Sequence, residues 1–365
     1  MKRIFTTRWA RILAAVVVIS VVGVSFASGC SVGYVWHVGW GQLDIIRSTV
    51  PVERVMSDPA TGDDIKGKLR VILEAKQYGE EVIGLKRTDS YTTYVALDRP
   101  VAAWNLMAAP KLRLEPVTWW FPIVGRMPYL GYFDKTKAIK KEARLRRKGY
   151  DTYLRGAAAY STLGWFTDPV FGPLLRYDIP TLVNVTIHEM THTTVFLKGR
   201  VAYNEGMALF VGNRGSLDFL SAKYGPDSRY VRAERNNIHN DRVFSAFLQR
   251  LHDKLRKLYD SDLPDAEKLK EREKIFTQSK EEFRGLPFRG AAYGSFLERD
   301  LNNAAILSRS IYYVDLDMYR ELYETLGGDL RKTMDFFKTL DKRKVDDPEA
   351  FTRRFIEENK KTQEN

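Results

Sequence analysis

Cysteine and histidine are scarce in this sequence. The 365 residues include one cysteine, Cys30, and five histidines. A single cysteine excludes a disulfide within the chain, so hydrophobic burial must stabilise the fold. With 44% hydrophobic and 28% charged residues, the composition is ordinary for a globular protein, and the length suits one large domain or two.

Repeats at a solenoid period and low-complexity tracts are also absent. The formal net charge is +12, yet no cluster of Lys and Arg with interleaved aromatic residues indicates a nucleic-acid surface, so we predict no nucleic-acid partner. Attraction of the basic surface to anionic lipid headgroups stays open. The apolar run from Ile12 to Ala27 has 16 residues, fewer than the roughly 20 that a membrane-spanning helix needs.

The beginning of the chain has the form of an export signal, with basic residues, the apolar run and then small residues. Ala27-Ser28-Gly29 directly before Cys30 resembles the bacterial lipobox, and a thioether-linked lipid would explain the lone cysteine. We therefore predict a lipoprotein signal peptide at 1–29 and a lipid anchor at Cys30 that tethers the protein to the bacterial cell envelope, facing the periplasm. Ser31 is typical of sorting to the outer membrane. The alternative is an uncleaved membrane anchor with a free thiol.

The rest of the chain is predicted as an α+β, mainly α-helical domain with a small sheet. A membrane-proximal segment at 30–56 precedes it, and its Trp36 and Trp40 either lie at a membrane interface or pack under the domain. We favour packing. The remaining predicted units are the domain at 57–355, a helical hairpin insertion at 216–290 and a charged tail at 356–365.

Local patterns predict the elements around a candidate site. Strand-like runs occur at 91–97, 101–106 and 150–154, and helical patterns occur at 57–78, 135–148 and 180–196. A further helix is expected from about Asn204 until Gly212 to Gly215 ends it, and a long helix is expected over 291–321.

The pentapeptide His188-Glu189-Met190-Thr191-His192 is the strongest chemical signal in the sequence. Its β-branched neighbours favour a strand locally, in which the two histidines would lie about 13 Å apart. In a helix they lie about 6 Å apart along the axis and on one face. That separation suits one Zn²⁺ ion at Zn–N distances of about 2.1 Å. We therefore predict a helix and expect packing to override propensity.

Glu205 is the candidate third ligand, because a turn at Gly199 would bring the next helix back against the first. A His₂Glu set is a known catalytic zinc arrangement, with the remaining position for water. Glu189 is predicted to be the base that takes a proton from this water and passes it to the leaving amine, without binding the metal itself. The predicted cofactor is one Zn²⁺ ion, and the predicted substrate is a peptide or protein.

The motif and the run Asn204-Glu205-Gly206-Met207-Ala208-Leu209-Phe210 resemble the zinc peptidases with glutamate as third ligand (gluzincins), thermolysin and the alanyl-aminopeptidases among them. Almost the whole chain after Cys30 is similar to a bacterial family of predicted aminopeptidase lipoproteins. The supporting stretches are Gly41-Gln42-Leu43, Ala103-Trp104-Asn105-Leu106, Leu114-Glu115-Pro116-Val117-Thr118-Trp119, Gly131-Tyr132-Phe133, Ala159-Tyr160-Ser161-Thr162-Leu163-Gly164-Trp165-Phe166 and Leu301-Asn302-Asn303-Ala304. The resemblance implies a zincin-like fold and a periplasm-facing, aminopeptidase-like metallopeptidase.

Three features depart from these relatives. The spacing from His192 to Glu205 is shorter than in the well-known aminopeptidases, so the connecting loop must be tight. Leu209 stands where thermolysin-like enzymes have an Asp that steadies the first histidine, so His188 needs another partner. The stretch 156–160 lacks the acidic residue that captures a free amino group. Aminopeptidase and endopeptidase activity both stay open, as does a non-catalytic lipoprotein that keeps the fold as a binding module. The intact Glu189 favours an enzyme.

Substrate-binding residues are predicted from their position. The stretch 156–166 lies upstream of the motif, where such peptidases hold the substrate backbone on an edge strand, which makes Tyr160 and Ser161 candidates. A plain structural strand is the alternative. The developing oxyanion needs a hydrogen-bond donor, for which the candidates are Tyr293, Tyr312, Tyr313, Asn302 and Asn303. The two asparagines are equally suited to capping a helix or to packing. The sequence indicates no oligomeric state.

Overall fold

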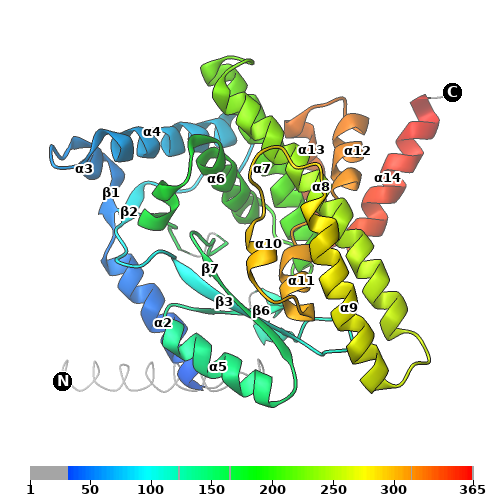
Figure 1. Cartoon of the computed structure of the whole chain (residues 1–365). Helices are drawn as coiled ribbons and strands as arrows, with labels where there is room; N and C mark the ends of the chain where they lie inside the picture. Colours follow the sequence, from blue (N-terminus) through cyan, green and yellow to red (C-terminus); the bar gives the residue numbers. More distant parts are fainter. Residues whose placement is uncertain (1–31, 122–123, 164–165, 314, 364–365) are drawn as a thin grey trace, which may run out of the picture.

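The computed structural model of the chain describes residues 32–121, 124–163, 166–313 and 315–363. The predicted signal peptide at 1–29 and the predicted lipidation site Cys30 lie outside these ranges. Helices dominate the described structure, and three small sheets complete it (Figure 1). This confirms the predicted α+β, mainly α-helical class. None of the described helices is both long enough and apolar enough to cross a membrane.

One sheet has the strand order β6–β3–β7, with all pairs antiparallel; the strands are β3 (Ala103–Ala109), β6 (Tyr129–Tyr132) and β7 (Asp151–Ala157). Side chains alternate along β3. Leu106 and Ala108 therefore pack on one face, against α5 (Lys135–Arg147), while Met107 and Ala109 pack on the other, against α11 (Asn303–Ser310). The central strand is covered on both faces, whereas β7 is an edge strand.

The other two sheets are smaller. One joins β1 (Val50–Pro51), β2 (Thr93–Val95) and β8 (Val170–Phe171), with β2 antiparallel to β1 and parallel to β8. The other is the hairpin of β4 (Trp119–Phe121) and β5 (Gly125–Met127). The predicted strands at 91–97, 101–106 and 150–154 thus correspond to β2, β3 and β7, with shifted ends.

The helices before the motif are α2 (Val32–Arg47), α3 (Val52–Ser57), α4 (Asp63–Tyr78), the π-helical turn η1 (Gly79–Ile83), α5 and the 3-10 turn η2 (Gly172–Arg176). The motif lies in α6 (Ile179–Thr194). The helices after it are α7 (Val201–Tyr224), α8 (Arg229–Tyr259), α9 (Asp265–Arg284), α10 (Ser295–Glu298), α11, α12 (Leu316–Thr325), α13 (Leu330–Arg343) and α14 (Pro348–Gln363). The predicted helices at 135–148 and 180–196 are confirmed. The charged segment at 356–365 continues α14 as far as Gln363.

Helix α7 corrects one prediction, because it continues through Gly212 and Gly215, where its end was expected. A Cβ atom at Gly215 would lie 2.7 Å from Ile83 Cδ1, and one at Gly212 would lie 3.0 Å from Asn184 Oδ1. The two glycines therefore let α7 approach α6 and η1 closely. Burial at this contact outweighs the helix propensity that each glycine forfeits, about 1 kcal/mol.

The long helix predicted over 291–321 is wrong, because this region contains α10, α11 and the start of α12. Asn302 and Asp315 cause the breaks. Their side chains accept hydrogen bonds from the N–H groups of Ala305 and Met318 and so cap new helices. The interruption leaves the residues after α11 in a turn, which carries Tyr312.

Trp36 and Trp40 on α2 do not pack under the domain, contrary to expectation. Their side chains are 63% and 57% exposed, and their rings are stacked with centroids 6.1 Å apart. Ile45 of α2 is buried in the domain, with 3% of its side chain exposed. The helix thus has an outer face that carries aromatic rings.

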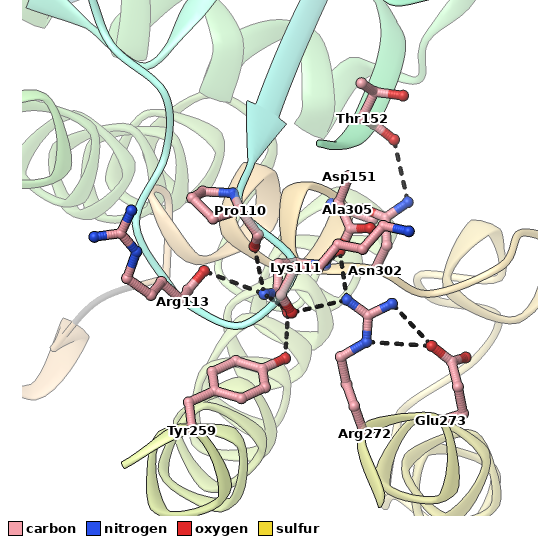
Figure 2. Close-up of polar contacts among 11 residues, drawn as sticks. Pro110, Lys111, Arg113, Asp151, Thr152, Tyr259, Arg272, Glu273, Asn302 and Ala305 are labelled. Carbon is pink, nitrogen blue, oxygen red and sulfur yellow. Dashed lines mark hydrogen bonds and ion pairs between the residues drawn. The ribbon is translucent and has the colours of Figure 1, made fainter. Parts of the chain in front are cut away.

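A buried ion pair joins the hairpin of α8 and α9 to the sheet. Arg272 on α9 donates from Nη1 to Asp151 Oδ2 at 2.9 Å, and both side chains are 8% exposed (Figure 2). Arg272 also donates to the Lys111 carbonyl at 2.8 Å. Asp151 in turn accepts from the backbone N–H of Asn303 at 3.1 Å. The hairpin predicted within 216–290 is therefore fixed to the start of β7 and of α11.

We expect Arg272→Met to destabilise the protein by about 3–5 kcal/mol, because the Asp151 carboxylate would stay buried without its cation. Urea denaturation followed by circular dichroism measures this change. The matched control is Arg250→Met on the same hairpin, which removes a more exposed pair with Glu282 and should cost about 1 kcal/mol or less. Equal effects of the two substitutions would contradict this role of the buried pair.

Candidate metal centre

Helix α6 forms although its sequence is rich in β-branched residues. Asp178 caps its N-terminus by accepting a hydrogen bond from the Thr181 N–H at 3.1 Å. The threonine hydroxyls inside the helix donate to the carbonyl four residues earlier, which satisfies them without leaving the helix; this holds for Thr186, Thr191, Thr193 and Thr194. Val183 and Ile187 are fully buried in the main core. Burial thus overrides the local preference for a strand, as predicted.

The turn between α6 and α7 is short and is closed by Asn204. Gly199 has a φ of 77° in this turn, a left-handed conformation that favours glycine. The Asn204 side chain accepts a hydrogen bond from the Leu197 N–H at 2.9 Å and donates one to the Leu197 carbonyl at 2.8 Å. This double contact sets the start of α7, so that the next residue, Glu205, faces the histidines of α6.

The donor atoms of His188, His192 and Glu205 form a nearly equilateral triangle. The Nε2 atoms of the two histidines lie 3.2 Å apart. Glu205 Oε2 lies 3.4 Å from His188 Nε2 and 3.5 Å from His192 Nε2. Ligands of a tetrahedral zinc ion at its usual bond lengths are separated by about 3.3–3.5 Å. Two imidazole nitrogens and a carboxylate oxygen at these separations could therefore hold one metal ion, and their spacing is compatible with zinc.

The two carboxyl groups of the site differ in their proton affinity. Burial alone would raise the pKa of Glu205, but His192 and His188 hold this pKa well below its ordinary value. Burial also raises the pKa of Glu189, and there the histidines oppose the effect only in part. Glu205 is thus an anion suited to binding a metal, whereas Glu189 has the raised proton affinity of a group that exchanges protons.

A cavity of about 1070 Å³ lies against these residues, a size that suits a bound ligand. Its lining is largely apolar and aromatic, and includes Tyr34, Val38, Phe121, Met127, Phe196 and Leu209. Glu189 and Glu205 are the only carboxylates among the described residues that line it. The cavity therefore offers an extended, mostly uncharged surface around the candidate metal centre.

Tyr312 and Arg155 form a pair beside the histidines. The ring centroid of Tyr312 lies 6.5 Å from that of His188, and its hydroxyl accepts a hydrogen bond from Arg155 Nη2 at 2.6 Å. Burial raises the pKa of Tyr312 to about 12, although Arg155 opposes this shift. The hydroxyl therefore keeps its proton. Because Arg155 donates to the hydroxyl oxygen, the tyrosine can donate that proton to another acceptor.

Arg155 and Tyr129 line the cavity but were not among the residues predicted from the sequence. Burial and the nearby Glu205 raise the pKa of Tyr129 well above its ordinary value. The one relevant signal was the strand-like run at 150–154, because the strand continues through Arg155 as β7. That pattern locates the strand but does not show that its end reaches the metal centre.

Tyr160 and Ser161 line the cavity, but their hydroxyls bond within the protein. Tyr160 donates to Gln42 Oε1 at 2.8 Å, and Ser161 donates to Asp168 Oδ2 at 3.3 Å. Strand β7 ends at Ala157. The edge strand predicted over 156–166 is therefore limited to its first two residues, and residues 158–163 form a loop along the cavity.

The structure does not bring Asn302 and Asn303 to the cavity. Asn302 caps α11 and donates to the Thr152 carbonyl at 3.1 Å (Figure 2). Asn303 is fully buried. Its side chain donates hydrogen bonds to the backbone carbonyls of a neighbouring loop, those of Pro110, Lys111 and Arg113. Both asparagines thus have the capping and packing roles that were the alternative to substrate binding.

Two of the three candidate tyrosines also have other partners. Tyr293 donates a hydrogen bond to Asp241 and stacks on Phe244, with centroids 4.2 Å apart. Tyr313 reaches the cavity wall, but its ring packs edge-on against Phe244 at 5.2 Å. Tyr312 is the candidate whose ring lies next to a histidine of the motif.

Most of the chain matches one known family. The family model described as "Putative aminopeptidase" matches residues 33–351, a range that contains the whole candidate metal centre. No curated protein and no solved structure matches the chain.

Proposed function

The chain belongs to the putative aminopeptidase family, and we propose that it is a zinc-dependent peptidase of the bacterial cell envelope. The observation that carries the proposal is the triangle of His188, His192 and Glu205, with sides of 3.2–3.5 Å, next to Glu189 in one cavity. The zincin-like fold is part of the proposal, and the motif on α6 with its glutamate on the following helix supports it.

His188, His192 and Glu205 would hold the zinc ion. When bound, zinc supplies Lewis acidity, which lowers the pKa of water and polarises a carbonyl group. Glu189 accepts a proton from the attacking water and delivers it to the nitrogen of the leaving amine. The carboxyl group is deprotonated before the first transfer and protonated before the second.

Tyr312 donates a hydrogen bond to the carbonyl oxygen as negative charge develops on it. The hydrogen bond from Arg155 at 2.6 Å fixes the hydroxyl and increases its acidity, since a nearby cation stabilises charge on the phenol oxygen. Arg155 is therefore a positioning residue that acts through Tyr312.

The outer edge of β7 supports binding of an extended peptide. The carbonyls of Thr152 and Leu154 accept hydrogen bonds from the side chains of Asn302 and Arg299. These two carbonyls therefore point away from β3. Alternation along an antiparallel strand directs the backbone of Gly156 to the same side, and Gly156 lines the cavity. A substrate strand would pair with the N–H and carbonyl groups of this glycine.

Attachment to the envelope is proposed from the sequence. The lipobox-like residues before Cys30 support a lipid anchor, with the body facing the periplasm. An endopeptidase of envelope proteins is the second candidate function. The lining of the cavity favours it, because Glu189 and Glu205 are the only carboxylates there among the residues that the structure describes. Both serve the metal centre, so none of the described carboxylates is left to bind a free amino terminus.

We expect cleavage of matched peptides with free and with acetylated N-termini at similar rates, since the described lining of the cavity holds no carboxylate besides Glu189 and Glu205. An enzyme with a dedicated polar site would discriminate by a factor of about 10⁴. The measurement is liquid chromatography of the products, with bound zinc determined by mass spectrometry on the same sample. Cleavage of the free peptides alone would establish an aminopeptidase, and the absence of bound zinc would remove the peptidase proposal.

Tyr312→Phe should lower kcat by about 10²–10³-fold with little change in KM, because the lost hydrogen bond forms as charge develops in the transition state. Zinc content should be unchanged. The matched control is Tyr160→Phe, which removes a hydroxyl of the same cavity that bonds to Gln42 and should have a small effect. Comparable losses in both variants would argue against a special role of Tyr312.

A further inference from the structure

Helix α2 has an exposed apolar stripe. Trp36, Trp40 and Leu43 are 63%, 57% and 44% exposed and recur at helical spacing, so they lie along one side of the helix. Arg47 continues the stripe and lies over the Trp40 ring at 5.9 Å. Exposed aromatic rings next to a cation are typical of segments that lie at a membrane–water interface.

Helix α5, which lies beside α2 (Figure 1), is strongly basic. Lys137 Nζ lies 3.1 Å from His37 Nδ1, which places the two helices in contact. Within Lys135–Arg147 there are seven basic residues and a single acidic residue, Glu142. Ile139, on the same helix, is 46% exposed. Apolar and cationic groups therefore occur together on α2 and α5.

Exposed apolar side chains are concentrated on these two helices. Among the described residues, nine large hydrophobic side chains are exposed, and five of them belong to α2 or α5. Trp36, Trp40 and Ile139 lie outside the cavity, whereas Leu43 and Ile46 line its wall. The apolar run from Ile12 to Ala27 ends shortly before α2 begins at Val32. The positive charge of α5, the exposed aromatic rings of α2 and the position of α2 in the chain thus indicate one binding partner, an anionic lipid bilayer.

We propose that α2 and α5 dock on an anionic bilayer surface, with Trp36 and Trp40 in the headgroup region and the α5 cations against lipid phosphates. Val38 and Gln42 of α2 line the cavity, so the docked helix places one wall of the cavity at the membrane surface. This inference rests on the exposed surface and holds whether or not the protein is a peptidase.

The test is fluorescence quenching in the full-length protein, reconstituted into vesicles whose phosphatidylcholine and phosphatidylglycerol carry brominated acyl chains. The difference between the wild type and Trp36→Phe/Trp40→Phe isolates the emission of these two among the seven tryptophans. We expect this difference signal to be blue-shifted and quenched in vesicles that contain phosphatidylglycerol.

Charge variants test the role of α5. Lys140→Gln/Arg144→Gln should weaken docking about 25-fold, since each basic residue near an anionic surface contributes about fivefold. The matched control, Lys342→Gln/Arg343→Gln at the end of α13, should retain the wild-type quenching. Emission of Trp36 and Trp40 that is insensitive to brominated lipid would overturn the proposal. If the emission is insensitive to brominated lipid and yet blue-shifted, another segment or a second copy of the chain covers the tryptophans instead of lipid.

Discussion

Glu189→Gln is expected to lower kcat for peptide hydrolysis by about 10²–10⁴-fold, the usual contribution of a general acid–base residue. Glutamine has nearly the same shape as glutamate but cannot take a proton from water or return it to the leaving amine. The triangle of His188, His192 and Glu205 does not include this side chain, so one zinc ion per chain should remain bound. Steady-state kinetics with mass-spectrometric zinc analysis measures both quantities.

The appropriate control for this substitution is Glu282→Gln. That carboxylate lies on α9 and pairs with Arg250 and Lys254, so its neutralisation should leave the kinetics unchanged. Loss of zinc from the Glu189 variant would mean that the glutamate binds the metal, which would contradict the role assigned to it. Unchanged kcat would remove the proposed mechanism.

Glu205→Gln should remove most of the bound zinc and, with it, the activity. The substitution replaces the anionic member of the ligand set by a neutral amide, while the histidines keep their positions on α6. Loss of a partner outside the ligand set already weakens metal binding by about 10–100-fold, so loss of a ligand should exceed 100-fold. Competition with a chromophoric zinc chelator measures the change in affinity.

Glu189→Gln and Glu205→Gln are matched controls for each other. Both exchange a carboxylate for an amide in the same cavity, yet the first should lose turnover with zinc retained, and the second should lose zinc. Wild-type zinc affinity in the Glu205 variant would show that the third ligand lies elsewhere. That result would remove the His₂Glu centre without affecting the membrane-docking proposal.

The sequence by itself was sufficient for the parts of the site that depend on local spacing. His188 and His192 lie one helical turn apart, and a strand could not bring them to one ion. Glu205 followed from the same reasoning, because a short turn between two helices leaves few arrangements. The structure adds the contact that closes this turn, the double hydrogen bond between Asn204 and Leu197.

The residues contributed by distant segments were decided only by tertiary structure. Arg155 and Tyr312 are 157 positions apart, and their meeting depends on the packing of α11 against the sheet. The length of α7 was also decided by tertiary structure. The helix continues through Gly212 and Gly215, where the close approach of α6 and η1 requires residues without side chains. Local propensity is worth about 1 kcal/mol per residue, whereas burial of a large side chain is worth about 1.5–3 kcal/mol. Where propensity and burial favour different structures, the summed free energy of burial from many distant contacts decides the outcome. That sum cannot be read from a short stretch of sequence.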